Sequence, residues 1–296
     1  MSLKMAEICV PAYAKVNLFL DITGRLDNGY HTLNTVMQQV ELCDTVTVRV
    51  RDGNGIAVSC DAEGIPCNER NIAFRAAKAF LDKTELEAEI LIDIEKRIPV
   101  MAGLGGSSTD GAAVLAALNR LCSEALSGEE LEKLGAELGA DVPFCVRGGA
   151  AVCMGIGDDM RSVSGLDGDC FIAIVKPDFA CDTAEGYRLY DREPVAEKGD
   201  FDGFLQALES GTAETGKRLY NVFERLYRDE RIERIKAELV KAGAMGACLT
   251  GSGSAVFGVF DDKEKAERAT AELQYGTKIL TKPLDGTCNK ARFVVK

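Results

Sequence analysis

The sequence predicts an α+β protein built from two domains. At 296 residues, the chain is longer than a single hydrophobic core usually supports, so two domains are the default expectation. Strand patterns and helix patterns occur together along the whole chain, and a polar, glycine-rich stretch at 155–169 divides them into two halves. We therefore expect an N-terminal domain over residues 1–157 and a C-terminal domain over residues 158–296.

The N-terminal half mixes strands and helices. Three segments in which β-branched and aromatic residues cluster or alternate predict strands at 8–23, 40–50 and 88–95. Three segments with apolar residues at helical spacing predict helices at 71–82, 109–121 and 128–138. The third helix has a defined start, because Ser127 and Glu130 are spaced as a capping box.

The C-terminal half begins with a strand at 171–175, and we expect a loop to follow from Pro177. Helical patterns follow at 201–210, 218–228 and 231–242. Two short strands then flank a glycine turn within 247–260, before a charged helix at 262–273 and a final strand at 291–295. This β-α-β-β-α-β order, with extra helices, is typical of a ferredoxin-like split unit.

Charge and cysteine content restrict the class of partner. A net charge of −12 argues against general affinity for nucleic acid or anionic membranes, because both are polyanions, yet it permits one small anionic ligand. No apolar run is long enough to span a bilayer, and the N-terminus lacks the apolar core of a signal peptide. Eleven cysteines without a Cys-x-x-Cys pair, beside a single histidine, predict reduced thiols in the cytoplasm rather than a zinc site.

One segment, PVMAGLGGSSTDGAAVLAALN at 99–119, joins an apolar run to an alanine-rich helix pattern. Its glycines, Gly103, Gly105 and Gly106, match neither a P-loop nor a dinucleotide-binding fingerprint. A glycine turn that feeds a helix offers free backbone N–H groups at the positive end of the helix dipole, which favours an anion. A tight strand-to-helix turn capped by a serine explains the same residues, so both interpretations stay open at this point.

Three other features are individually ordinary. Lys15 interrupts the apolar strand pattern PAYAKVNLFL, as an exposed edge strand would. Asp141 follows a helix end and precedes Pro143, where aspartate commonly forms a turn. The glycine-serine turn in CLTGSGSAVFGVF at 248–260 has the composition of a simple hairpin.

Taken together, the four features resemble the GHMP kinase superfamily in order, spacing and residue type. That family shares a Pro-x-x-Lys-x-Asn-Leu-like start, a Pro-x-x-x-Gly-Leu-Gly-[Gly/Ser]-Ser-Ser loop and a late Gly-x-Gly turn, which this chain carries between residue 11 and about residue 260. The resemblance implies a two-domain GHMP kinase fold. Its N-terminal domain would be similar to domain 2 of ribosomal protein S5, and its C-terminal domain would be ferredoxin-like.

A narrower resemblance is to the branch of this superfamily that phosphorylates a methylerythritol carrying a cytidine diphosphate. Gly29-Tyr30-His31 with the later Asp44-Thr45, and the segment LGADVPFCVRGGAAVCMGIGD, are characteristic of that branch. The resemblance implies ATP-dependent phosphorylation of the 2-hydroxyl of the erythritol, a step of the non-mevalonate route to isoprenoid precursors. A GHMP kinase for a sugar, homoserine or mevalonate is the alternative. A silent ligand sensor is disfavoured because Lys15 and Asp141 are both present, and an RNA-binding module because the chain is acidic.

By resemblance, Lys15 and Asp141 lie at the reaction centre. The pair is chemically sensible, since a lysine neutralises charge on the transferred phosphate and an aspartate orients or deprotonates the attacking hydroxyl. A free aspartate is a weak base for an alcohol, and a loose transition state needs little early deprotonation. Both roles of Asp141 therefore stay open.

The resemblance also implies two sets of binding residues. The ATP-binding residues would be Asn71, Lys96, Pro99, Gly103, Leu104, Gly105, Gly106, Ser107 and Ser108, with Mg²⁺ as cofactor and the Ser108 hydroxyl as its candidate ligand. The substrate-binding residues would be Asn17, Tyr30, His31, Asp110, Thr183, Tyr187, Gly251 and Ser252. Within the second set, Tyr30 and His31 are expected to recognise cytosine by stacking and hydrogen bonding. Phe179 competes with Tyr187 as the second stacking ring.

The chain departs from the family pattern at one point. YNVFE at 220–224 places Val222 where many relatives have an aspartate, so one carboxylate is missing there. The expected partner is a small-molecule substrate, without nucleic acid or membrane, and the choice between monomer and homodimer stays open.

Overall fold

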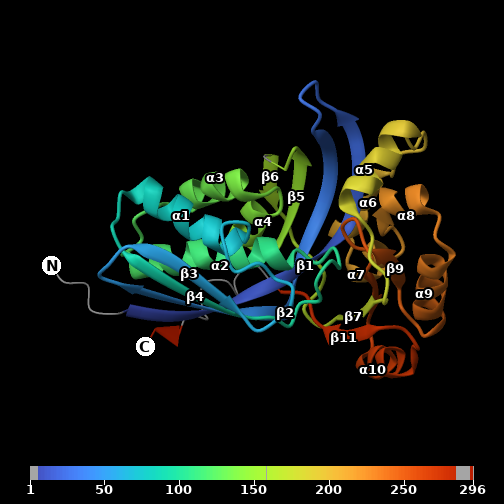
Figure 1. Ribbon diagram of the computed structural model, residues 1–296. Helices are drawn as coiled ribbons and strands as arrows, with labels where there is room; N and C mark the ends of the chain where they lie inside the picture. The colour runs from blue at the N-terminus through green and yellow to red at the C-terminus, as the bar shows by residue number, and fades with distance from the viewer. Residues whose placement is uncertain (1–5, 158, 285–293, 296) are drawn as a thin grey trace.

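The computed structural model describes residues 6–157, 159–284 and 294–295. Within them, two β-sheets pack side by side, and each sheet is covered by helices (Figure 1). A buried apolar cluster that includes Phe19, Val36, Ile174 and Phe257 joins the two halves. The two sheets therefore meet directly, and a site at their junction draws residues from both.

The first sheet is organised around a long antiparallel hairpin, formed by β1 (Ala6–Arg25) and β2 (His31–Arg51). The path β12-β1-β2-β4-β3 also includes β3 (Gly55–Cys60), β4 (Glu89–Glu95) and β12 (Val294–Val295). Three strands pair off this path: β5 (Ala150–Gly155) with β2, β6 (Asp159–Ser162) with β5, and β8 (Tyr220–Asn221) with β1.

Four helices follow in the N-terminal half: α1 (Ile72–Thr84), α2 (Gly106–Leu121), α3 (Gly128–Leu138) and α4 (Val142–Arg147). Helices α1 and α2 pack on the first sheet, against the alternating buried side chains Ile90, Ile92 and Ile94 of β4. The capping box of Ser127 and Glu130 is confirmed. Helix α2 is buried on most sides, which explains its nearly continuous apolar sequence.

The second sheet has the antiparallel order β11-β7-β10-β9. Its strands are β7 (Phe171–Lys176), β9 (Gly246–Leu249), β10 (Val256–Phe260) and β11 (Thr277–Thr281). Helices α9 (Glu230–Lys241) and α10 (Lys263–Glu272) pack against it. The expected β-α-β-β-α-β arrangement is therefore present. Four further helices precede α9: α5 (Thr183–Arg192), α6 (Phe201–Glu209), α7 (Thr212–Gly216) and α8 (Val222–Tyr227).

One helix of the C-terminal half was missed and one expectation was wrong. A loop starts at Pro177 as expected, but it is followed by α5 from Thr183. The buried face of α5 holds only Gly186 and Tyr190, too few for a clear apolar period. The last strand of the second sheet is β11 and not the segment 291–295. Of that segment, 291–293 lie outside the described residues, and β12 pairs with β1 in the first sheet.

The second strand of the hairpin is longer than the sequence analysis predicted. Strand β2 begins at His31, nine positions before the expected 40, because Thr32, Asn34 and Thr35 hide the apolar alternation. The short elements β3, β5, β6, β8, α4 and α7 were not anticipated, and α8 covers only part of the expected 218–228. Strand β6 follows the expected domain boundary but pairs in the first sheet.

None of the ten cysteines among the described residues forms a disulfide; the eleventh, Cys288, lies outside them. Among the helices that the structure describes, none combines the length and the apolar character needed to cross a bilayer.

Candidate active site

A cleft of about 820 Å³ opens at the junction of the two halves. All but two of the candidate catalytic and binding residues line it: Lys15, Asn17, Asn71, Lys96, Pro99, Gly103, Leu104, Gly105, Gly106, Ser107, Ser108, Asp110, Asp141, Thr183, Tyr187, Gly251 and Ser252. The exceptions are Tyr30 and His31. The fold thus gathers residues from β1, the loop before α2, the start of α4, α5 and the turn between β9 and β10 around one cavity.

Two positions of the glycine loop require glycine for steric reasons. Gly103 has φ +76°, and a Cβ there would lie 2.1 Å from the carbonyl oxygen of Thr250. Gly105 has φ +73°, and its Cβ would lie 3.0 Å from Cγ of Lys15. The first glycine therefore lets the turn between β9 and β10 approach the loop, and the second lets Lys15 pass beneath it.

Helix α2 begins without a side-chain cap. Its N-cap residue is Gly105, in the left-handed conformation, so the interpretation as a serine-capped turn is wrong. The amides of Gly106, Ser107 and Ser108 are the first of the helix and have no partner within it. These amides, together with the helix dipole, form an anion-binding end that faces the cleft.

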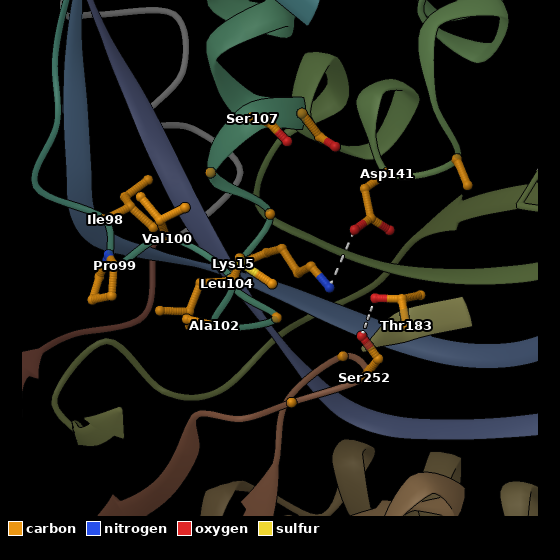
Figure 2. Close-up of a pocket in the computed structure, with 18 of the residues that line it drawn as sticks. Lys15, Ile98, Pro99, Val100, Ala102, Leu104, Ser107, Asp141, Thr183 and Ser252 are labelled. Carbon is orange, nitrogen blue, oxygen red and sulfur yellow. Dashed lines mark hydrogen bonds and ion pairs between the residues drawn. The ribbon is translucent and has the colours of Figure 1, made fainter. Parts of the chain in front are cut away.

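Lys15 and Asp141 meet in front of this helix end (Figure 2). Nζ of Lys15 lies 3.3 Å from Oδ2 of Asp141, and the Lys15 side chain is only 4% exposed against 36% for Asp141. Asp141 is the N-cap residue of α4, but its carboxylate makes no capping hydrogen bond. That carboxylate is therefore free to interact with the ammonium group and with a ligand in the cleft.

Asn17 links Lys15 to the second half of the molecule. Its Oδ1 accepts hydrogen bonds from Nζ of Lys15 at 2.7 Å and from the amide of Gly251 at 2.9 Å. Its Nδ2 donates to Oγ1 of Thr35 at 2.9 Å. The side chain expected to contact substrate thus also fixes the ammonium group of Lys15 relative to the turn between β9 and β10.

That turn, residues 250–253, is held from several sides. Nδ2 of Asn221 donates to the carbonyl oxygens of Leu249 and Gly251, each at 2.8 Å. Oγ of Ser252 lies 2.6 Å from Oγ1 of Thr183 (Figure 2). Both hydroxyls line the cleft on the side opposite the start of α2. The second half of the molecule therefore contributes a fixed wall to the site.

Three charged side chains are buried together beneath the loop. Nζ of Lys96 binds Oδ2 of Asp44 and lies 2.7 Å from Oδ2 of Asp110. Asp44 also accepts hydrogen bonds from the amides of Arg97 and Ile98, whereas Oδ1 of Asp110 is buried without a hydrogen-bond partner. Burial, and then the charge of Asp44, raise the pKa of Asp110 to about 7, against the lowering effect of Lys96. Burial lowers the pKa of Lys96, but the two carboxylates outweigh it and raise that pKa overall.

Asn71 has a structural task at the edge of the cleft. Its Oδ1 caps α1 by accepting from the amide of Ala73, and its Nδ2 donates to the carbonyl oxygen of Pro66. This candidate ATP residue lines the cleft with its polar atoms already paired. The neighbouring Arg70, which lines the cleft and is exposed, was not anticipated.

The aromatic end of the site differs from the expectation. Tyr187 lines the cleft and stacks on His31, with ring centroids 4.7 Å apart, and burial raises the pKa of Tyr187 to about 12. Tyr30 is 67% exposed at the hairpin tip. The ring of Phe179 is covered by the guanidinium of Arg231 and does not line the cleft, whereas Tyr187 does.

Four contact residues were not assigned to the site from the sequence: Thr35, Asp44, Asn221 and Thr250. Thr35 could have been found by counting along β2, since it shares the parity of Leu33, which also lines the cleft. Asp44 was noted only as part of the Asp44-Thr45 pair of the resemblance, without a role. Asn221 and Thr250 act through pairings between distant segments, for which a single sequence carries no signal.

Two family models match this chain. The model of the GHMP kinases N terminal domain matches residues 71–149, and the model of the GHMP kinases C terminal matches residues 194–277. Together with the glycine loop and the fold, these matches define the class of the protein. The chain belongs to the GHMP kinase family.

Curated relatives narrow this class. A protein of Desulfitobacterium hafniense named 4-diphosphocytidyl-2-C-methyl-D-erythritol kinase is 44% identical over 264 residues, covering 88% of this chain and 89% of the relative. A protein of Clostridium acetobutylicum with the same name is 39% identical, covering 90% of this chain and 95% of the relative. Within the GHMP kinases, the chain therefore belongs to the same family as these two relatives.

Solved structures agree with the fold. A crystal structure of 4-(cytidine 5'-diphospho)-2C-methyl-D-erythritol kinase matches with a TM-score of 0.78 and 29% identity, over 93% of this chain and 98% of that one. A homoserine kinase from Cytophaga hutchinsonii matches with a TM-score of 0.74 at 18% identity, over 100% and 99% of the two chains. The second likeness concerns the fold alone. The expected two-domain GHMP kinase fold is confirmed.

Proposed function

We propose that this protein transfers the γ-phosphoryl group of ATP to the 2-hydroxyl of 4-diphosphocytidyl-2-C-methyl-D-erythritol, in the non-mevalonate route to isoprenoid precursors. The observation that carries the proposal is the Lys15–Asp141 pair, set before an uncapped helix start within one cleft. The names of the curated relatives supply the substrate. A GHMP kinase for another small alcohol is the alternative that the experiment below tests.

The donor end suits a triphosphate. The amides at the start of α2, with the Ser107 and Ser108 hydroxyls, receive phosphate oxygens, and the missing side chains of the glycine loop allow the phosphates to approach the backbone. Lys15, whose ammonium group is buried, compensates the charge that develops on the transferred group. Asp141 accepts a hydrogen bond from the attacking hydroxyl and holds it in line.

The acceptor end suits a long substrate. His31 lies four positions before Thr35 on β2, and Thr35 contacts Asn17 beside the reaction centre. Four residues of strand span about 13 Å, which leaves room for a diphosphate and a ribose between the reacting hydroxyl and a base. Tyr187 supplies a ring on which that base can stack, worth about 1–3 kcal/mol.

We include Mg²⁺ as a cofactor that arrives with ATP. Among the residues described, no group of three or more His, Cys, Asp or Glu is placed to hold a metal ion. A cleft with few protein ligands is compatible with Mg²⁺, because this ion is commonly bound through substrate phosphates and retained waters. The Ser108 hydroxyl at the start of α2 would be its protein ligand. When bound, the ion supplies charge neutralisation at the phosphates.

We also place the reaction in the cytoplasm, with a small molecule as partner and no nucleic acid or membrane. The described cysteines form no disulfide with one another, which supports a reducing compartment. The net charge of −12 disfavours polyanionic partners.

A coupled kinase assay tests the proposal with four acceptors: the diphosphocytidyl substrate, uncytidylated methylerythritol phosphate, homoserine and mevalonate. We expect ATP-dependent turnover with the first and at least a hundredfold lower kcat/KM with the others, because only the first fills the aromatic end. Comparable turnover of the uncytidylated compound would refute base recognition. Preference for homoserine or mevalonate would establish the alternative.

A further inference from the structure

The imidazole of His31 is held in one orientation by residues of α5. Its Nε2 lies 2.7 Å from Oδ1 of Asp191, a residue 160 positions away in the sequence. One face stacks on Tyr187, and the ring of Tyr190 lies nearly perpendicular to the imidazole, with centroids 5.8 Å apart. The side chain is only 9% exposed. In Figure 1, α5 runs beside the projecting end of the hairpin formed by β1 and β2.

Asp191 decides which ring nitrogen carries the proton. An ionised carboxylate can only accept a hydrogen bond, and Nη1 of Arg25 lies 3.4 Å from its other oxygen, Oδ2. Nε2 of His31 must therefore be the protonated nitrogen. In a neutral imidazole, Nδ1 is then a hydrogen-bond acceptor, and no donor from the described residues contacts it.

His31 lies on the face of β2 that forms the cleft. Leu33 and Thr35 line the cleft, and side chains alternate along a strand, so His31 shares their face. Residues 31–35 of β2 pair without an inserted residue of their own, because the register shift opposite them adds its extra residue to β1, between Ile22 and Gly24. Tyr187, on which His31 stacks, lines the cleft as well. His31 thus continues the line of residues that leads outward from the reaction centre.

We propose that Asp191 is a positioning residue that makes this end of the cleft select cytosine over uracil. By fixing the proton on Nε2, it presents Nδ1 of His31 as an acceptor. Cytosine offers an amino group at C4, whereas uracil offers a carbonyl oxygen at the same position. The amino group donates to Nδ1, and the carbonyl would set two acceptors against each other and leave both unpaired. The inference rests on the proposed function and adds to it the origin of base selectivity.

The test compares the diphosphocytidyl substrate with its uridine analogue at pH 8. Asp191→Leu removes the acceptor for Nε2, so we expect the cytidine-to-uridine ratio of kcat/KM to fall about tenfold. The loss should appear as a higher KM for the cytidine substrate, with kcat and the KM for ATP unchanged. Asp191→Asn, whose amide oxygen still accepts from Nε2, should restore most of the ratio.

Glu185→Leu is the matched control, because Glu185 lies on α5 and pairs with Arg188 without touching His31. It should leave the ratio unchanged. If Asp191→Leu raises KM equally for both substrates and preserves the ratio, Asp191 is only structural and the inference is overturned. Titration of the protein with CDP and UDP gives the same ratio without turnover. Failure of the wild-type protein to phosphorylate the cytidine substrate would instead refute the proposed function, a distinguishable result.

Discussion

The two ends of the cleft are built in different ways. At the phosphate end, backbone groups and buried side chains form the site: the start of α2, Lys15 at 4% exposure, and the turn at residues 250–253 locked to Gly103 and Asn17. At the proposed base end, Tyr187 lines the cleft, His31 stacks behind it against α5, and Tyr30 lies at the hairpin tip with 67% of its surface exposed.

We infer from this difference that the phosphate end serves the chemical step and that the base end selects the substrate. An interlocked backbone loses little freedom when ligand binds, so the phosphate end is preorganised for charge stabilisation. The base end relies on a few side-chain contacts that can be removed without disturbing the core. We therefore expect variants at the phosphate end to reduce turnover or stability strongly, and variants at the base end to change KM selectively.

The strongest test of the phosphate end is Asp141→Asn. The amide cannot accept the proton of the attacking hydroxyl, and it no longer pairs as an anion with Lys15. We expect kcat to fall by at least about a hundredfold, as for loss of a positioned acid-base group, while ATP binding stays within about threefold. A coupled kinase assay and titration with ATP measure the two quantities. Near-normal turnover would remove Asp141 from the reaction centre.

The interlock itself is tested by Gly103→Ala. The new Cβ would need to occupy space 2.1 Å from the Thr250 carbonyl oxygen at a φ of +76°. We expect the free energy of unfolding to fall by about 3 kcal/mol and the KM for ATP to rise, measured by denaturant unfolding and kinetics.

Gly128→Ala provides the matched control for this glycine. Gly128 is the first residue of α3, and a Cβ there meets nothing within 4 Å. Its stability should stay within about 0.5 kcal/mol of the wild type or rise slightly. If both variants behave alike, the approach of the turn to the loop does not constrain Gly103.

The buried charges under the loop predict a pH effect on stability. Because the pKa of Asp110 is raised to about 7, the folded protein binds this proton more tightly than the unfolded chain. The resulting stabilisation is complete below about pH 4 and is lost as the pH rises through about 7. Asp110→Asn cannot titrate, so it should flatten this fall by about 3 kcal/mol between pH 4.5 and 8. Unfolding curves from pH 4.5 to 8 measure the slope, and equal slopes in both proteins would contradict the assigned burial.

The same contrast explains what the sequence could predict. The glycine loop is recognisable because it depends on local chain geometry, with left-handed glycines before a helix start, whereas Lys15 and Asp141 were assigned only from the resemblance to the GHMP kinases. The long strands of both sheets and most long helices were predicted from local periodicity, but β3, β5, β6, β8 and β11 were not.

Contacts between distant segments were not predictable. Nothing in the segment around Asp191 indicates that it meets His31 across 160 positions. Asn17 and Asn71 were assigned to ligands from resemblance, but their bonds to Lys15, Gly251 and Ala73 emerge only when the chain is folded. Helix α5 was also missed, because its apolar face is narrow and gives no clear helical period.

The mildest test concerns the base end. His31→Ala removes the ring stacked on Tyr187 and the partner of Asp191, without touching the glycine loop. We expect KM for the cytidine substrate to rise about tenfold, within the range of one stacking or hydrogen-bonding contact, and KM for ATP to change less than twofold. Tyr30→Ala, at the exposed hairpin tip, is the comparison. If it matches His31→Ala, stacking at the tip contributes as much as the held imidazole. If either variant raises the KM for ATP and the KM for the cytidine substrate equally, the two ends of the cleft are coupled. The division between a catalytic end and a selecting end then fails.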